Sequence, residues 1–366
     1  MRDFSKAKRV VIKIGTNTLT KNGGIDTEYF SDLACQVASL AAAKFQVVIV
    51  TSGAIGMGAM QLELAGKVTG IKLRQACAAI GQPLLMAEYK KAFDKFNLTV
   101  SQVLLTAWVF NNRTSYLNLR NAMDTLLGMK VVPIINENDS ISTDEIGSAF
   151  GDNDKLSALV ASKIDADLLI MLTDIDALYD SDPRKNADAK PVRIVYEITD
   201  EIIKSAGAAG STHSTGGMKT KIDAAKIAAN AGCRIVLANG REGDVITRIM
   251  AGEEIGTVFL PRRRLSARVR WILNTAPAGT IRIDEGAMAA LLKRKSLLPT
   301  GIISIEGQFD AGQVIALNDK AKAVTNLSSS ELKAVAGKHS SEIKKVLGPH
   351  RKDVVASPED IVLLGM

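Results

Sequence analysis

The sequence predicts an α/β fold: a three-layer sandwich with a mostly parallel central sheet between two layers of helices, joined to a small β-rich domain. Up to about residue 250, short apolar runs rich in β-branched residues alternate with longer helical patterns. The strand candidates are continuously apolar, which is typical of parallel strands with helices on both faces. From residue 261 onward, short alternating strands predict the second domain.

Local patterns give the elements of the larger part. The first helix candidate shows a clear helical period, since Leu33, Val37 and Leu40 share one face and Asp26 can cap its start. The strand candidates are Val10–Ile14, Val47–Thr51, Thr99–Leu105, Val131–Ile135, Asp167–Leu172 and Arg234–Leu237. The helix candidates are Asp26–Lys44, Lys72–Lys95 (which Pro83 could interrupt), Arg113–Leu127, Lys155–Lys163 and Met218–Ala231.

The pattern changes after residue 260. The basic run Pro261-Arg262-Arg263-Arg264 and the turn formers Pro277-Ala278-Gly279 read as a connection between domains. The strand candidates beyond it are Thr280–Ile283, Gly301–Glu306 and Gln313–Leu317. We therefore expect a first domain over 1–260, a linker over 261–277, a β-rich domain over 278–356 and a C-terminal tail over 357–366.

Composition excludes several classes of protein. With 46% apolar and 23% charged residues, the 366-residue chain is not globally disordered. Its apolar runs are shorter than the ~20 residues of a membrane span, and the N-terminus lacks the apolar stretch of a signal peptide. Three distant cysteines indicate neither a disulfide framework nor a zinc site, so we expect a cytoplasmic protein without membrane contact.

The net charge of +7 lies entirely in the last part of the chain. Residues 1–260 hold 29 basic and 29 acidic residues, whereas residues 261–366 hold 17 basic and 10 acidic residues. Such a division suggests two functions or two partners.

Six polar or glycine-rich segments lie where strand candidates end or helix candidates begin. Since ligands of parallel α/β sheets bind at the carboxyl ends of the strands, these segments could share one crevice. They are Lys13–Asn17, Thr51–Gly56, Asn136–Asp139, Gly151–Lys155, Thr173–Tyr179 with Asp182–Arg184, and Ser214–Lys221.

Together these segments have the composition of a phosphoryl-transfer site. Lys13 and Lys221 could neutralise a phosphate, and Gly-rich helix starts could bind it through backbone N–H groups. Asp154 could cap the following helix or organise lysines and Mg²⁺, and the carboxylate of Asp139 could hold an ammonium group. Each segment alone also fits a solvated lysine, a tight turn or a capped loop. The chain has only three histidines, which suits a carboxylate acceptor that needs no general base.

At these segments the sequence resembles the amino acid kinase family. The motifs KIGTN, TSGAIG, NEND, GDND, MLTD with DPR, and TGGMKTK occur in that family's order and spacing. The resemblance is greatest to the branch that phosphorylates the side-chain carboxylate of L-glutamate with ATP, which begins proline biosynthesis. The segment from about Ala278 to Val355 resembles a PUA domain.

The resemblance implies a role for individual residues. It implies catalytic roles for Lys13, Asp154 and Lys221. It implies substrate binding by Ser52, Asn138, Asp139 and Asn153. It implies nucleotide binding by Lys13, Gly15, Thr173, Asp174, Thr215, Gly216, Gly217, Met218, Lys219, Thr220 and Lys221. The cofactors would be ATP and Mg²⁺, with the metal ligands unassigned. Ala177 and Ser214 depart from the family's pattern, which has glycine there; a positive φ at Ala177 would strain the backbone.

The resemblance also implies L-glutamate as substrate, proline as feedback inhibitor and a homo-oligomer, either a dimer or a tetramer. Two alternatives remain open. A related kinase could act on another acid, although an N-acetylated substrate offers no ammonium to Asp139. The basic tail could instead bind RNA, although Phe309 is the only aromatic residue of the PUA-like segment to stack on bases.

Overall fold

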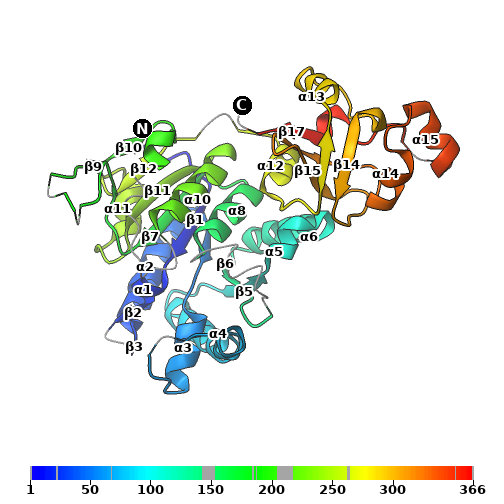
Figure 1. The fold of residues 1–366 in the computed structure, drawn as a ribbon. Helices are drawn as coiled ribbons and strands as arrows, with labels where there is room; N and C mark the ends of the chain where they lie inside the picture. The colour runs from blue at the N-terminus through cyan, green and yellow to red at the C-terminus, as the bar shows by residue number, and fades with distance from the viewer. Residues whose placement is uncertain are drawn as a thin grey trace. The chain divides into compact units, whose positions relative to one another are not determined.

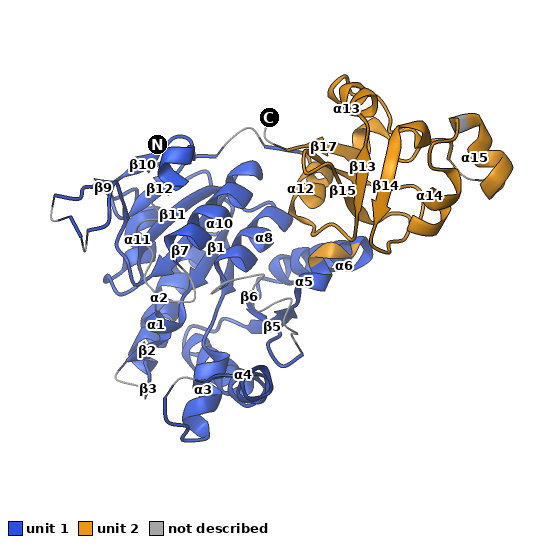
Figure 2. Ribbon diagram, in the orientation of Figure 1, with its two compact units in different colours: residues 1–109, 113–265 blue, residues 110–112, 266–366 orange. Residues whose placement is uncertain are grey.

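The computed structural model describes residues 2–21, 24–66, 68–141, 153–183, 185–186, 188–203, 217–261, 264–350 and 352–364. The chain forms two compact units, which Figure 2 colours separately. The larger unit holds residues 1–109 and 113–265, and the smaller unit holds residues 110–112 and 266–366.

The larger unit is built on an eight-stranded, mostly parallel sheet. In spatial order its strands are β10 (Ile194–Val195), β12 (Thr257–Phe259), β11 (Arg234–Asn239), β7 (Leu168–Thr173), β1 (Arg9–Ile14), β4 (Gln46–Val50), β6 (Val132–Glu137) and β5 (Val100–Leu105). The six strands from β11 to β5 are parallel, and β12 runs antiparallel to β11. All six strand candidates are confirmed, each to within two residues at its ends.

Helices cover both faces of this sheet, as the sequence predicts (Figure 1). On one face lie α2 (Thr27–Ala42), α4 (Ile71–Asp94) and α11 (Val245–Met250), whose apolar residues join one core cluster. On the other face lie α6 (Arg113–Gly128), α8 (Asp154–Lys163) and α10 (Met218–Asn230), and α8 packs on both β1 and α10. The shorter elements are α1 (Thr16–Leu19), β2 (Thr20–Lys21), β3 (Gly24–Ile25), α3 (Ala54–Gln61), α5 (Ala107–Asn111), β8 (Leu178–Tyr179) and β9 (Pro191–Val192).

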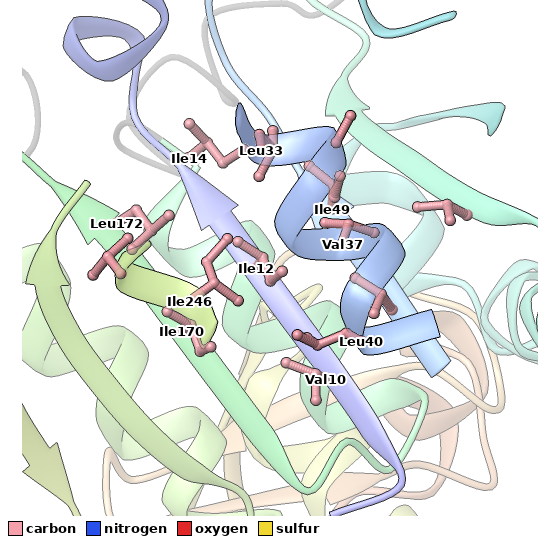
Figure 3. Close-up of a cluster of buried hydrophobic side chains, with 14 of the residues drawn as sticks. Val10, Ile12, Ile14, Leu33, Val37, Leu40, Ile49, Ile170, Leu172 and Ile246 are labelled. Atoms are coloured by element: carbon pink, nitrogen blue, oxygen red, sulfur yellow. The ribbon is translucent and has the colours of Figure 1, made fainter. Parts of the chain in front are cut away.

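The alternation of side chains along β1 decides which residue reaches the site. Val10, Ile12 and Ile14 point into the cluster under α2, where Leu33, Val37 and Leu40 meet them (Figure 3). Successive side chains of a strand point to opposite faces, so Val11 and Lys13 face the side that α8 and α10 cover. A buried lysine on that face needs a charged partner from one of those helices.

Two glycines allow α3 and α4 to pack closely. A Cβ atom on Gly58 would lie 1.9 Å from the carbonyl oxygen of Cys77, and one on Gly81 would lie 1.8 Å from that of Ala54. The expectation that Pro83 could interrupt the second helix is wrong, because α4 runs unbroken through it. Buried residues beyond Pro83, among them Leu85 and Tyr89, hold the helix on the sheet despite the lost hydrogen bond.

The smaller unit has its own five-stranded sheet. Its strands, in spatial order, are β14 (Ile302–Glu306), β13 (Thr280–Ile283), β15 (Val314–Leu317), β16 (Ala321–Val324) and β17 (Ile361–Leu363). Its helices are α12 (Ala267–Asn274), α13 (Glu285–Leu292), α14 (Ser329–Val335) and α15 (Ser340–Leu347), with 3₁₀ turns at Pro299–Gly301 and Pro358–Asp360. Thus α12 lies in the segment expected to be a linker, and β17 lies in the segment expected to be a tail, where it pairs with β16.

Phe309, the aromatic residue considered for base stacking, is buried in the smaller unit, and so is Trp271. Phe309 belongs to its apolar core. Trp271 is also buried, and its indole Nε1 donates to the carbonyl oxygen of Phe110 at 3.1 Å. Among the helices in the described ranges, none combines the length and the apolar character that crossing a membrane requires.

Candidate active site

Three charged side chains from different elements meet on the α8 side of the sheet. Lys13 Nζ lies 2.8 Å from Asp154 Oδ1, and Lys221 Nζ lies 3.2 Å from Asp154 Oδ2. The hydroxyl of Thr220 also donates to Asp154 Oδ2, at 2.9 Å. The aspartate is completely buried, and both lysines are at most 4% exposed. The sequence expectation that these three residues converge is therefore met by the geometry.

Local structure explains the convergence. Lys13 is near the carboxyl end of the central strand β1, Asp154 is the first residue of α8, and Lys221 is in the first turn of α10. The suggestion that Asp154 caps α8 is wrong: Asn153 is the N-cap residue, with φ of 60°, and its side chain makes no capping bond. Asp154 instead directs its carboxylate toward the two ammonium groups, because each buried lysine needs an anion.

The electrostatic balance keeps Asp154 ionised. Burial alone would raise the pKa of its carboxyl group, but the nearby charges of Lys13 and Lys221, with the hydrogen bonds from Lys13 and Thr220, hold that pKa below its ordinary value. One carboxylate therefore holds two ammonium groups side by side. Two ammonium groups held side by side are suited to bind an anionic ligand.

A chain of buried amides lies beside this cluster. Asn153 Nδ2 donates to the carbonyl oxygen of Thr51 at 2.6 Å, to Ser52 Oγ at 3.1 Å and to Asn136 Oδ1 at 2.9 Å. Asn136 Nδ2 in turn donates to Gln82 Oε1 at 2.8 Å. Since the carbonyl oxygen of Thr51 can only accept, the amide nitrogen of Asn153 must face it. That constraint fixes the direction of each amide in the chain.

These residues border a cleft of about 690 Å³ at the carboxyl ends of the strands. Gly15, Ser52, Asn136, Asp139, Asn153, Thr173 and Asp174 all line it, together with Arg74. Lys13 itself does not line the cleft, but it lies directly behind Gly15, because a Cβ atom on that glycine would be 3.5 Å from Lys13 Nζ. Burial raises the pKa of Asp139 to about 6, although Arg74 opposes the shift. The carboxyl group of Asp139 thus lines the cleft, while the buried lysine cluster lies behind Gly15.

The profile of the amino acid kinase family matches residues 8–239. The chain belongs to the amino acid kinase family. A second profile, that of the PUA domain, matches residues 279–347. Both matches agree with the fold, since the first covers the parallel sheet and the second covers most of the smaller unit.

Relatives within the amino acid kinase family match nearly the whole chain. The glutamate 5-kinase of Methanosarcina acetivorans is 48% identical over 342 residues, which cover 90% of this chain and 89% of the relative. That of Caldanaerobacter subterraneus subsp. tengcongensis is 47% identical over 333 residues, covering 88% and 89%. The solved carbamate kinase from Giardia lamblia bound to AMP-PNP covers 70% of this chain and 100% of its own, with TM-score 0.52 and 17% identity, so it shares the fold.

For an amino acid kinase, the end of the cleft lined by Thr173 and Asp174 is of particular interest. Thr173 Oγ1 donates to Asp174 Oδ1 at 2.9 Å, and Asn17 Nδ2 donates to Asp174 Oδ2 at 3.3 Å. Gly217 is the N-cap residue of α10 and offers no side chain to that helix's first amides, which include those of Met218 and Lys219. Free amides at a helix start are suited to phosphate oxygens. Thr215 and Gly216 lie outside the described residues, as does Ser214.

Two details differ from expectation. Asn138 does not line the cleft: its Oδ1 accepts from Ser140 Oγ at 2.6 Å, and Asn136 of the same motif borders the cleft instead. Asn136 and Glu137 are still part of β6, whose alternation turns the asparagine inward. Ala177 is buried, and it is not among the described residues with positive φ, so alanine is unstrained there.

Sequence reasoning missed three supporting residues of this family member. Gln82 and Arg74 lie on α4, where their spacing indicates only a helix surface. Arg241 holds the segment after β1: its guanidinium pairs with Asp26 and donates to the carbonyl oxygens of Asn17 and Thr20. Two of the three, Gln82 and Arg241, act through residues distant in sequence, so no local motif could identify their partners.

Proposed function

We propose that this chain transfers the terminal phosphoryl group of ATP to the side-chain carboxylate of L-glutamate. The products are ADP and L-glutamyl 5-phosphate, and the reaction is the first step of proline biosynthesis. The observation that carries the proposal is the contact of Lys13 and Lys221 with one buried carboxylate, that of Asp154. The names of the relatives reported above support the choice of substrate.

The chemistry needs little covalent help from the protein. The substrate carboxylate is ionised at neutral pH and attacks the terminal phosphorus, so that an O–P bond forms while the bond to the bridging oxygen of ADP breaks. Negative charge is spread over the transferring oxygens. Lys13 and Lys221 would neutralise it, and Asp154 would hold both ammonium groups in position. Because these groups are already buried and paired, no reorganisation is needed at the moment of transfer.

The carboxylate of Asp139, which lines the cleft, favours an amino acid as the phosphoryl acceptor. Asp139 would pair with the substrate ammonium, and Ser52 and Asn153, which also line the cleft, would contact the substrate. An N-acetylated acid would bring no positive charge to Asp139, and would leave a partly buried carboxylate uncompensated. This contrast favours L-glutamate over N-acetylglutamate.

The residues at the nucleotide end fit ATP. Gly15, Gly217 and the first amides of α10 would bind phosphate oxygens, and Thr173 and Asp174 would lie near the nucleoside. Mg²⁺ would shield the phosphate charge. The described residues contain no group of three or more side chains that could hold a metal ion. We therefore expect the ion to be held mainly by phosphate oxygens and water, which is common for Mg²⁺.

Regulation and assembly belong to the same proposal. Proline resembles a cyclised glutamate skeleton, so it would compete at the glutamate end of the cleft. A proline titration should raise the apparent KM for glutamate; an unchanged KM would count against competition. A homo-oligomer, either a dimer or a tetramer, is expected, and light scattering on the full chain would measure its mass.

RNA binding by the basic tail is a weaker candidate. Phe309 and Trp271 are buried, so they offer no face to a base, and only salt-sensitive contacts with phosphates would remain. Filter binding of the full chain across a salt series would detect such contacts.

The proposed reaction is tested by ADP release from Mg-ATP with a panel of acceptors. L-Glutamate should be turned over, whereas N-acetylglutamate, L-aspartate and UMP should give at most a few per cent of that rate. A preference for any other member of the panel would overturn the proposal.

A further inference from the structure

The cleft contains one cation that the proposed chemistry leaves unused. Arg74 is the only lysine or arginine among the described residues that line it. It lies in the first turn of α4, where its backbone N–H donates to the carbonyl oxygen of Gly70 at 3.1 Å. In the described part of the chain its guanidinium makes neither a hydrogen bond nor an ion pair, and it is exposed. Its donors are therefore available to a ligand.

The surroundings of Arg74 are acidic. Glu137, Asp139 and Asp174 also line the cleft, so the described lining holds three carboxylates and one guanidinium. Arg74 is close enough to Asp139 to oppose the rise in the pKa of that carboxyl group. The two side chains therefore present opposite charges at the same end of the cleft.

The charged groups of L-glutamate match the opposite charges of Arg74 and Asp139. L-Glutamate has two carboxylates and one ammonium group, and the reacting carboxylate must lie near Lys13 and Lys221. Apart from Arg74, the charged side chains that line the cleft among the described residues are anionic. They would repel the α-carboxylate of the substrate unless a cation faced it. A guanidinium is suited to this task because it binds a carboxylate through two parallel hydrogen bonds.

We propose that Arg74 binds the α-carboxylate of the substrate while Asp139 binds its α-ammonium, so that the two residues together select a free α-amino acid. This inference rests on the proposed function and adds a specificity-determining residue to it. Loss of the guanidinium should weaken only those ligands that carry an α-carboxylate.

Two ligands separate the charges of the amino acid. 4-Aminobutanoate keeps the amino group and the reacting carboxylate but lacks the α-carboxylate, whereas glutarate keeps both carboxylates but lacks the amino group. The dissociation constant of each, or its inhibition constant against L-glutamate, is measured for the wild type and for Arg74→Gln. Arg74→Lys keeps the positive charge but cannot form the two parallel hydrogen bonds of a guanidinium. Lys72→Gln removes the same charge from an exposed position on the same helical turn and serves as the matched control.

Arg74→Gln should raise the KM for L-glutamate and the dissociation constant of glutarate by about 10- to 100-fold, the range expected for hydrogen bonds to a charged group. It should change binding of 4-aminobutanoate and the KM for ATP by less than about twofold. Arg74→Lys should recover part of the loss, and Lys72→Gln should match the wild type.

Two results would overturn the inference while leaving the proposed function intact: turnover of L-glutamate with an unchanged KM in Arg74→Gln, or equal losses for glutarate and 4-aminobutanoate. A wild-type enzyme that does not phosphorylate L-glutamate would instead overturn the proposed function, and the inference with it.

Discussion

Lys13 Nζ lies 2.8 Å from Asp154 Oδ1, and both side chains are buried where the central strand meets α8. Lys221 contacts the other oxygen of the same carboxylate. One aspartate thus holds in place both of the charges that the proposed reaction needs. Several predictions about activity, pH and stability depend on this contact and on the amides and glycines that support it.

Asp154→Asn should lower kcat by about 100-fold or more, because the two ammonium groups lose the anion that positions them. It should also destabilise the fold by about 3–5 kcal/mol, the cost of leaving buried charges unpaired. Because the pKa of Asp154 is lowered in the folded state, its stabilisation is present above ~pH 4 and is lost as the pH falls further. Asp94→Asn, which breaks an exposed pair with Lys90, is the control and should change Tm little. Equal Tm and kcat for the two variants would contradict the assignment.

Asp139 should give the enzyme a pH dependence on its acidic side. The pKa of its carboxyl group is raised to about 6, and only the ionised form attracts the substrate ammonium. We expect kcat/KM for L-glutamate to fall as the pH drops through about 6, while the KM for ATP changes little. The Asp139→Asn variant should lack this inflection and bind glutamate weakly at every pH. A profile that keeps the same inflection in the variant would show that another group titrates.

Gln82 should act on the substrate through two other amides. Gln82→Leu removes the acceptor of Asn136 Nδ2, so Asn136 no longer holds Asn153 in one orientation. We expect the KM for L-glutamate to rise about 10-fold, with the KM for ATP unchanged. Gln61→Leu, at an exposed position at the end of α3, should behave as the wild type. Equal changes in both KM values would indicate general damage to the fold rather than a positioning role.

Gly81→Ala should loosen α3 from α4. The added Cβ atom would lie 1.8 Å from the carbonyl oxygen of Ala54, so the helices must separate. A loss of about 1–3 kcal/mol or more in the free energy of unfolding is expected. The KM for glutamate should also rise, because Arg74 lies on α4 and Ser52 directly precedes the N-cap of α3. Gly128→Ala, where no atom lies within 4 Å of the added carbon, should be neutral or stabilising. Urea denaturation of both variants measures the difference.

The sheet, the main helices and the meeting of Lys13, Asp154 and Lys221 could be predicted because local signals carry them. Continuous apolar runs indicate buried parallel strands, and parallel strands bring their carboxyl ends to one edge. A lysine at an alternate position of such a strand must then face a layer of helices. These steps use only residues close together in sequence and one rule of topology.

The rest depended on contacts between residues distant in sequence. From the sequence, neighbouring polar residues of the GDND motif could each be the N-cap of α8. Only the packed structure shows that Asn153 is the N-cap residue and that Asp154 pairs with the two lysines instead. Gln82 and Arg74 have the pattern of ordinary helix residues, and only the packed structure brings Gln82 to Asn136 of β6 and Arg74 to the cleft. Pro83 predicts a break locally, but burial of the residues around it keeps α4 whole.

The central claim is that Lys13 and Lys221 act on one transferring phosphoryl group, and the most direct test measures kcat for ADP release with L-glutamate in Lys13→Met, Lys221→Met and the double variant. We expect each single variant to lose at least about 100-fold in kcat while circular dichroism shows a folded chain, and the double variant to lose less than the product of the two. A folded single variant that keeps more than about a tenth of the wild-type kcat would contradict the claim.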